Sequence, residues 1–384
     1  MLNDTPRVAE AFQAGGVLEE TLATIRKDAL EYRALRRVPQ TIIEKFQKIG
    51  VYRALVAQRF GGLEATPMEF LELIEAIAQA DASAGWVASF GVSATYLAAL
   101  PIDTLETLYA KGPDVVFAGA IFPPQKAKAV DGGFIVNGRW PYASGCPGAS
   151  LIGVGIAVEG EEGGLPRTAV MPASAVRIDE TWNTIGLAAT GSHDVVVEDV
   201  FVPAEWTFIR GGEPNLDMPI YSYPSLGFAA QVLTVVGLGC ARRALEEVKQ
   251  MAAGRRSITG APTMADRAHV QQITGEAEAQ LSAARSFFYE TTRDVWSKLC
   301  AGQAISDAEA NLVRLAATNG AQAAFDVARM CFTLGGIAAV QTDHILGRCF
   351  QDCAVVAQHA FMARGNYEAA GKVMLGRGGR PGYP

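Results

Sequence analysis

Charged side chains and histidine are scarce in this sequence of 384 residues, and the motifs of several enzyme classes are absent. Only 19% of the residues are Asp, Glu, Lys or Arg, and the four histidines are widely spaced, which argues against a cluster of metal ligands. The net charge of −7 is dispersed along the chain, which argues against a nucleic acid as partner. There is no P-loop, no G-x-S-x-G, no H-E-x-x-H, and no G-x-G-x-x-G after a predicted strand. These absences leave a reaction carried by a bound cofactor, or no reaction.

Sequence features of exported or membrane proteins are also absent. The six cysteines form no C-x-x-C pair, and we interpret them as small buried side chains in a reducing compartment. The first residues, MLNDTPRVAEAFQ, lack the basic and then apolar segments of a signal peptide. No uncharged apolar stretch of about 18 residues predicts a membrane span. We therefore expect a cytoplasmic protein with no membrane partner.

The hydrophobic pattern changes twice along the chain and predicts three domains. Residues 1–114 carry apolar residues three and four apart, which is typical of helices. Residues 115–217 alternate with a period of two and contain Asp-Gly and Gly-Gly pairs, which predicts a mostly antiparallel β barrel or sandwich. Residues 218–384 predict a four-helix bundle, with helices at 226–252, 264–301, 306–334 and 343–373. The expected fold class is α+β with three domains.

Three stretches of the sequence, together with this order of domains, resemble one family. They are GRWPYASG at 138–145, TWNTIGLAATGSHDVVVEDVFVP at 181–203 and CFQDCAVVAQHAFMARGNYEAAGKVMLG at 349–376. The first two are similar to the acyl-CoA dehydrogenase superfamily. The third resembles the oxygen-using branch of that superfamily, the two-component flavin-dependent monooxygenases. The resemblance extends over nearly the whole chain.

The resemblance implies an activity, a cofactor and partners. It implies hydroxylation or epoxidation of an aromatic ring, phenolic or indole-like, through a C4a-hydroperoxide of the flavin. Dioxygen would be the co-substrate, and a separate NAD(P)H-dependent reductase would supply the reduced flavin, with FADH2 favoured over FMNH2. The implied assembly is a homotetramer. Arg256 and, from a neighbouring subunit, Gly335 and Gly336 would hold the tail of the flavin, although the usual Arg-x-x-Phe-Gly reads Arg-Ser-Ile-Thr-Gly here.

The end of the strand predicted around residue 140 carries the first site residues. The resemblance places the Ser144 hydroxyl at the flavin N5 and C4-carbonyl edge, whereas the residues alone also fit a serine in a turn. Trp140 and Tyr142 alternate around Pro141 and are expected to share one strand face where the proline leaves the pleat intact, as walls for the flavin or as core. From the second motif, the expected flavin-binding residues are Thr190, Gly191 and Ser192.

His359 is the second predicted catalytic residue, within the last helix. The resemblance puts Ala360 and Ala230 at the two places where dehydrogenases carry their catalytic glutamate, and alanine cannot remove a proton. This disfavours an acyl-CoA dehydrogenase or oxidase, which stays an alternative beside a non-catalytic binding protein. Histidine can give or hold a proton near pH 7, which suits oxygen chemistry, although a lone histidine in an apolar helix also fits a core position.

The substrate pocket is expected to be aromatic and uncharged. The segment 83–99 is apolar nearly all round, and its Tyr96 needs a polar partner if it is buried. Few charges line the expected pocket elements, so a neutral, flat, indole-like molecule is favoured. The expected substrate-binding residues are Phe90, Tyr96, Trp140 and His359.

Overall fold

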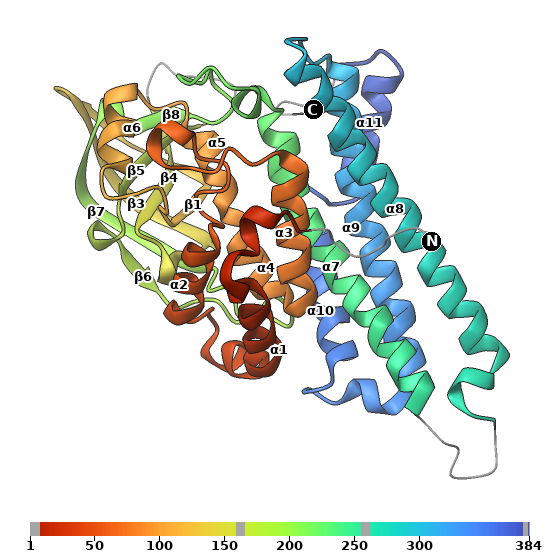
Figure 1. Ribbon diagram of the computed structural model, residues 1–384. Helices are drawn as coiled ribbons and strands as arrows, with labels where there is room; N and C mark the ends of the chain where they lie inside the picture. Colours follow the sequence, from red (N-terminus) through yellow and green to blue (C-terminus); the bar gives the residue numbers. More distant parts are fainter. Residues whose placement is uncertain (1–7, 159–165, 255–261, 379–382, 384) are drawn as a thin grey trace.

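A computed structural model describes residues 8–158, 166–254, 262–378 and 383 (Figure 1). Helices come first along the chain, strands follow, and long helices come last, as the hydrophobic pattern predicts. The sheets lie on one side of the molecule and the long helices on the other, with α3 and α4 between them (Figure 1). The first helices are α1 (Val17–Leu35), α2 (Gln40–Ile49), α3 (Pro67–Ala80), α4 (Ala82–Ala88), α5 (Ser93–Leu97) and α6 (Ile102–Tyr109).

Side-chain caps define where α3 and α4 begin. Thr66 Oγ1 accepts a hydrogen bond from the Glu69 N–H at 3.2 Å, and the Glu69 carboxylate accepts one from the Thr66 N–H at 2.8 Å. This capping box satisfies two backbone donors that the helix itself leaves unpaired. Asp81 caps α4 by accepting from the Ala84 N–H at 3.0 Å. Because Asp81 is extended (φ −158°, ψ 131°), the chain changes direction between the two helices.

The middle region consists of two four-stranded sheets around a shared apolar core. The strand orders are β1-β4-β5-β8 and β2-β3-β7-β6. Strands β1 and β4 are parallel and the other neighbours are antiparallel, which confirms the prediction of a mostly antiparallel β domain. The strands are β1 (Phe117–Lys126), β2 (Lys128–Val130), β3 (Gly133–Ala143), β4 (Leu151–Ala157), β5 (Arg167–Pro172), β6 (Arg177–Asp179), β7 (His193–Pro203) and β8 (Thr207–Ile209).

The C-terminal bundle differs from the prediction in its last helix. The first three long helices are α7 (Ser225–Gly254), α8 (Ala268–Cys300) and α9 (Asp307–Gly335). The prediction of one continuous helix over 343–373 was wrong, because the structure divides it into α10 (Ile345–Gln358) and α11 (Gly365–Met374). His359 leaves the helical conformation (φ −60°, ψ 140°), and its Nδ1 accepts a hydrogen bond from the Phe361 N–H at 3.2 Å. This local bond takes the place of a helical backbone bond.

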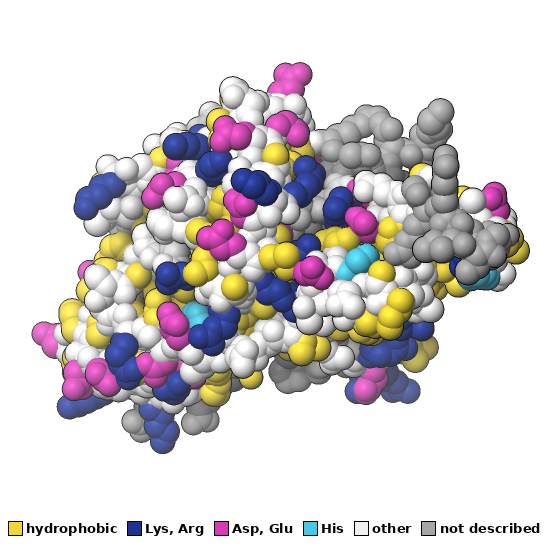
Figure 2. All heavy atoms as spheres, turned by 90° about the horizontal axis from the view of Figure 1, so that it is seen from below, with side chains coloured by type: hydrophobic (Ala, Val, Ile, Leu, Met, Phe, Trp, Pro, Cys, Tyr) yellow, Lys and Arg dark blue, Asp and Glu magenta, His cyan; other side chains and the backbone are white. Residues whose placement is uncertain are grey.

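Two long helical segments, Ser225–Ala253 and Asp307–Val340, have the length and composition of a membrane span. In the first, 89% of the apolar window is buried inside the protein, as in the core helix of a globular domain. On the face drawn in Figure 2, acidic and basic side chains are interspersed, without a large patch of one sign. Among the residues that the structure describes, no group of three or more His, Cys, Asp or Glu side chains could hold a metal ion.

Candidate active site

Three hydroxyl groups form a chain of hydrogen bonds where β3 ends and β7 begins. Ser144 Oγ lies 2.7 Å from Ser192 Oγ, which lies 2.6 Å from Thr190 Oγ1. All three side chains are buried. Gly191, between the last two, has a φ of +57°, a left-handed conformation that glycine adopts without strain. The fold therefore joins the two sequence motifs into one polar site.

The far end of this chain is anchored on the backbone. Thr190 Oγ1 lies 2.9 Å from the carbonyl oxygen of Leu187, which can only accept a hydrogen bond. When Thr190 donates to Leu187, Ser192 donates to Thr190 and Ser144 donates to Ser192, so Ser144 Oγ keeps its lone pairs free. When all three protons point the other way, Ser144 becomes a donor. Depending on the direction of these hydrogen bonds, the Ser144 hydroxyl can therefore accept a hydrogen bond from a ligand or donate one to it.

Trp140 and Tyr142 lie in different environments, so the prediction that they share one strand face was wrong. Trp140 has no exposed surface, and its Nε1 donates to the carbonyl oxygen of Gly155 at 2.8 Å within the core between the sheets. Tyr142 has a φ of +65° and is 69% exposed. The pairing of β3 with β7 shifts between Trp140 and Ala143, which turns the second ring outward. We therefore assign Trp140 to the core, contrary to its predicted contact with flavin or substrate.

The exposed ring of Tyr142 stays a predicted wall for the flavin. It stands edge-on to Trp182, with ring centroids 6.3 Å apart. A tyrosine with a positive φ is strained, and strain of this kind gathers at functional sites. Tyr142 also directly precedes the strand end at which the Ser144 hydroxyl lies.

The short helix α4 connects the Ser144 region with His359. A side-chain carbon placed on Gly145 would lie 3.7 Å from Val87 Cγ1, so the turn after Ser144 packs against α4. The next residue toward the N-terminus, Trp86, stands edge-on to His359, with ring centroids 5.6 Å apart. The turn after Ser144 and the His359 ring therefore contact neighbouring residues of the same short helix.

His359 lies in the turn after α10, where its protonation is restricted. Burial, followed by the nearby Arg210 and Arg314, lowers the pKa of the imidazole from 6.5 to about 4. The ring is therefore neutral at pH 7. Because Nδ1 accepts from the Phe361 N–H, the single ring proton lies on Nε2. His359 thus offers an N–H donor at neutral pH. Contrary to the expectation from the sequence, it does not titrate near pH 7 but acts as a hydrogen-bond donor of fixed orientation.

Two arginines approach the aromatic cluster around His359, which the sequence analysis missed. Arg210 Cζ lies 3.9 Å from the centroid of the Tyr96 ring and 5.7 Å from that of Phe361. Arg314 Cζ lies 5.4 Å from the Phe361 centroid, and the Phe361 and His359 rings are 5.1 Å apart. The expectation that few charges line this region was wrong, because Arg210 follows β8 and Arg314 lies on α9, both far from Tyr96 in sequence.

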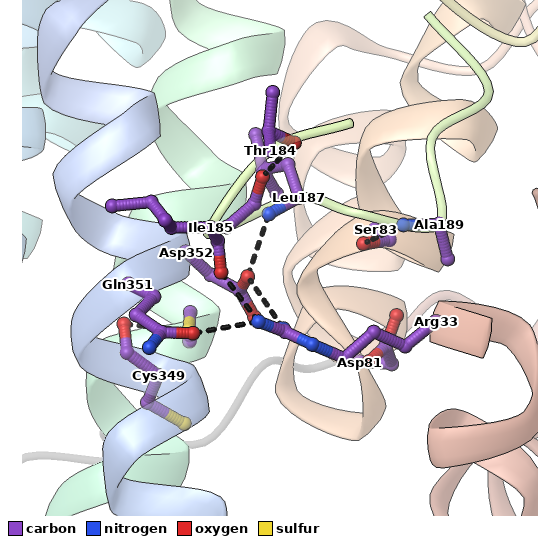
Figure 3. A network of polar contacts seen from close by, with 12 residues as sticks. Arg33, Asp81, Ser83, Thr184, Ile185, Leu187, Ala189, Cys349, Gln351 and Asp352 are labelled. Atoms are coloured by element: carbon purple, nitrogen blue, oxygen red, sulfur yellow. Dashed lines mark hydrogen bonds and ion pairs between the residues drawn. The ribbon is translucent and has the colours of Figure 1, made fainter. Parts of the chain in front are cut away.

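A polar network holds the loop before Thr190 against the bundle (Figure 3). The Leu187 N–H donates to Asp352 Oδ1 at 2.7 Å, and Arg33 from α1 donates to Gln351 Oε1 at 2.6 Å. Arg33 Nη1 also lies 3.9 Å from Asp352 Oδ1. Burial, followed by the neighbouring carboxylate of Asp81, raises the pKa of Asp352 to about 7. The sequence signal for Asp352 was the Gln351-Asp352 pair within the third motif.

The backbone of the loop before Thr190 also lies very close to the backbone of α10. A side-chain carbon on Gly186 would lie 2.2 Å from the carbonyl oxygen of Gln351, so only glycine fits where the loop crosses α10. Further along, the Ala189 N–H donates to Ser83 Oγ on α4 at 3.3 Å (Figure 3). The loop that carries Thr190 and Ser192 is thus held at both ends, by α10 and by α4.

We expect Asp352→Asn to change how stability depends on pH. Between pH 4 and pH 7 the folded state keeps a proton on Asp352 that the unfolded chain has lost, since the folded pKa is about 7 and the ordinary value is 3.8. Raising the pH through this interval therefore destabilises the wild-type fold, while Asn can still accept from the Leu187 N–H. The free energy of unfolding of the variant relative to wild type should rise by on the order of 1 kcal/mol per pH unit.

Urea unfolding of both proteins at several pH values measures this difference. The charged neighbours of Asp352 are Asp81, Arg33 and Arg348, and all three are unchanged in the variant. His359 has the opposite pH dependence below pH 6.5, but it is common to both proteins and cancels. A relative stability that stays constant with pH would contradict the raised pKa of Asp352.

For the remaining predicted residues that it describes, the structure gives positions but no contact with His359 or the hydroxyl chain. Phe90 is partly buried on a 3-10 turn, Ser89–Val92, and packs against the main core. Gly335 ends α9, and Gly336 has a φ of +59° and a ψ of −147°, a conformation open to glycine. Their contact with a neighbouring subunit's flavin stays a prediction. Arg256 lies outside the described residues.

Comparison with known proteins places the chain in a family. A model of the "Acyl-CoA dehydrogenase, C-terminal domain" matches residues 231–364. The chain is 51% identical over 378 residues to an indole-3-acetate monooxygenase of Pseudomonas putida, covering 98% of this chain and 97% of the relative. It is 31% identical over 278 residues, 67% of each chain, to the oxygenase component of an FADH2-dependent resorcinol hydroxylase of Rhizobium sp.. The crystal structure of 3-HSA hydroxylase from Rhodococcus sp. RHA1 matches with a TM-score of 0.88 and 27% identity, covering 95% and 98% of the two chains. The chain belongs to the flavin-dependent monooxygenases of the acyl-CoA dehydrogenase superfamily.

Proposed function

We propose that this monooxygenase inserts oxygen into the ring of an indole-type aromatic acid such as indole-3-acetate, the compound named for its relative in Pseudomonas putida. The observation that carries the site assignment is that the Ser144 turn and His359 border the same helix, α4. In the net reaction one oxygen atom of dioxygen enters a ring C–H bond, and the other leaves as water with the two electrons and two protons of the reduced flavin.

The hydroxyl chain fits the N5 edge of a flavin. N5 carries a proton in the reduced ring and a lone pair in the oxidised ring, and Ser144 can accept from the first or donate to the second as the chain reverses. The exposed Tyr142 ring offers a flat apolar surface beside it. When bound, the reduced flavin supplies the electrons that activate dioxygen.

The residues around His359 position the substrate and exclude water. The Nε2–H of His359 can donate to an oxygen atom at the ring or at the oxidant, and its orientation is fixed by the bond to the Phe361 N–H. Trp86 and Phe361 both pack edge-on against the imidazole. A dry aromatic surrounding of this kind strengthens a hydrogen bond relative to water.

The partners follow from the same family. Related enzymes are oxygenase components, so a separate reductase supplies the reduced flavin and the substrate is a small aromatic molecule. We propose FADH2 rather than FMNH2, NAD(P)H as the electron source of the reductase, and a cytoplasmic location. The dehydrogenase alternative lacks support, since Ala230 and Ala360 occupy both expected positions of the catalytic base.

We propose a homotetramer assembled through the bundle. The segment Asp307–Val340 is apolar enough to span a membrane, yet only 39% of its apolar window is buried within one chain. Beyond Gly336, Ile337 is 83% exposed and Val340 is 56% exposed. Neighbouring copies that cover this segment would also bring Gly335 and Gly336 to a second subunit.

The function is tested with purified protein, a flavin reductase, NADH, FAD and indole-3-acetate under labelled dioxygen. We expect a product that gains one labelled oxygen atom, at a rate at least tenfold above that without the oxygenase. Without the reductase, chemically reduced FAD should support one turnover. Absence of labelled product, together with bleaching of bound oxidised flavin by an acyl-CoA, would favour the dehydrogenase alternative.

A further inference from the structure

The Arg210 guanidinium is partly buried and has no matching anion among the residues that the structure describes. Its Nε is buried and has no hydrogen-bond partner among the described residues, and its side chain forms no ion pair with any residue that the structure describes. The guanidinium lies over the Tyr96 ring, with Cζ 3.9 Å from the centroid. Contact with an aromatic face compensates only part of the hydration that the buried Nε has lost. An anionic group of a ligand would give the guanidinium the partner that it lacks.

Tyr96 provides a second unpaired donor beside it. The side chain is 8% exposed, and its buried hydroxyl has no hydrogen-bond partner in the described part of the chain. A buried phenol without a partner carries a desolvation cost that a bound ligand can remove. One guanidinium and one phenol that can both donate are the groups that bind a carboxylate, whose oxygens only accept.

The position of this pair relative to His359 favours an aromatic ligand with an acidic side chain. Phe361 is close to both, since its ring centroid is 5.7 Å from Arg210 Cζ and 5.1 Å from the centroid of the His359 ring. Arg314 adds a second positive charge near Phe361, with its Cζ 5.4 Å from the ring centroid. A ring held at His359 would therefore have its acidic group near the arginines, with apolar contacts between.

We infer that Arg210, assisted by the Tyr96 hydroxyl, binds the carboxylate of the aromatic substrate and makes the site selective for aromatic acids. This inference rests on the proposed function and replaces the expectation of a neutral substrate. A guanidinium can bind both carboxylate oxygens, which also orients the ring toward His359. Arg210 is thus a specificity-determining residue: it binds and orients the substrate and takes no part in the oxygen transfer.

Binding measurements with two ligands separate this role from a structural one. Indole-3-acetate carries the carboxylate and indole does not. In Arg210→Gln we expect the Kd for indole-3-acetate to rise roughly 30-fold, because a buried charge partner is lost, while the Kd for indole changes less than about twofold. Arg210→Lys should restore part of the preference, and Tyr96→Phe, which keeps the packing, should weaken indole-3-acetate binding roughly fivefold.

The matched control is Arg59→Gln. Arg59 also lies over an aromatic ring, with Cζ 5.0 Å from the Phe60 centroid, but it is half exposed and pairs with Glu106 on the surface. This variant should bind both ligands as wild type does. Equal losses for indole-3-acetate and indole in Arg210→Gln, or no loss for either, would overturn the assignment while the oxygenation assay still supports the proposed function. Failure of wild type to bind or oxygenate indole-3-acetate would overturn the proposed function and this assignment with it.

Discussion

Replacing Ser144 by alanine should uncouple oxygen consumption from hydroxylation. The substitution removes the hydroxyl at the end of the chain opposite Thr190, and with it the proposed contact with the flavin N5 edge. We expect product formed per reduced flavin oxidised to fall roughly tenfold, and hydrogen peroxide to rise in proportion, since one preorganised hydrogen bond in a dry site has an effect of at least this size. Rapid mixing of reduced flavin, substrate and dioxygen, followed by product and peroxide assays, measures the ratio.

Two further serine variants give this experiment its internal comparison. Ser192→Ala keeps the Ser144 hydroxyl but removes the partner that fixes its direction, so its coupling should lie between those of Ser144→Ala and wild type. Ser174→Ala, at an exposed position of the same domain, should behave as wild type. Full coupling in Ser144→Ala would remove this residue from the proposed site.

Replacing His359 by asparagine should lower the rate of hydroxylation about 100-fold, the scale of a positioned proton donor or base. The asparagine Oδ1 can still accept from the Phe361 N–H, so the turn after α10 is preserved while the Nε2–H donor is lost. Single-turnover product formation measures the rate, and circular dichroism checks the fold.

His344→Asn is the matched control. His344 caps the start of α10 through the same kind of bond, with Nδ1 accepting from the Leu346 N–H at 3.2 Å. It lies at the opposite end of the helix from His359, so this variant should hydroxylate at the wild-type rate. Equal rate losses in the two variants would mean that His359 acts only through the local backbone.

The pH dependence of hydroxylation gives a second check on His359. Because the pKa of its imidazole is lowered to about 4, the ring is neutral and keeps its Nε2 proton throughout the usual assay range. The wild-type rate should therefore show no step attributable to His359 between about pH 5 and pH 8, and should fall only as the ring becomes charged below that range. A step near pH 6.5 that vanishes in His359→Asn would contradict the structural assignment.

Local sequence signals predicted much of the fold and the polar part of the site. The apolar pattern predicted the three long helices α7, α8 and α9, of which α7 is buried on all sides over most of its length. The hydroxyl residues 144, 190 and 192 were found from two motifs and do meet in space. The break at His359 was missed, since one side-chain bond to the Phe361 N–H is enough to end a helix whose apolar pattern continues.

Two aromatic assignments show where a local pattern fails. Alternation put Trp140 and Tyr142 on one strand face, but a positive φ at Tyr142 and a shift in pairing reversed its direction. The positive φ and the shift in pairing could not be predicted from the residue types, because tyrosine adopts a positive φ only where the surrounding structure imposes it. The core position of Trp140 is shown by its bond to Gly155 on β4, a strand of the opposite sheet.

By itself the sequence determined the order of helices and strands, which depends on residue type and short spacing, and its resemblance to a family indicated the hydroxyl residues and the histidine in place of a catalytic glutamate. Only the tertiary structure decided the charge of the pocket, the protonation of His359 and the anchoring of the 187–192 loop by Asp352. Those properties arise where β8, α9 and α10 meet α4 and the Tyr96 segment, and electrostatic effects depend on distance and burial in space, which spacing along the chain does not reveal.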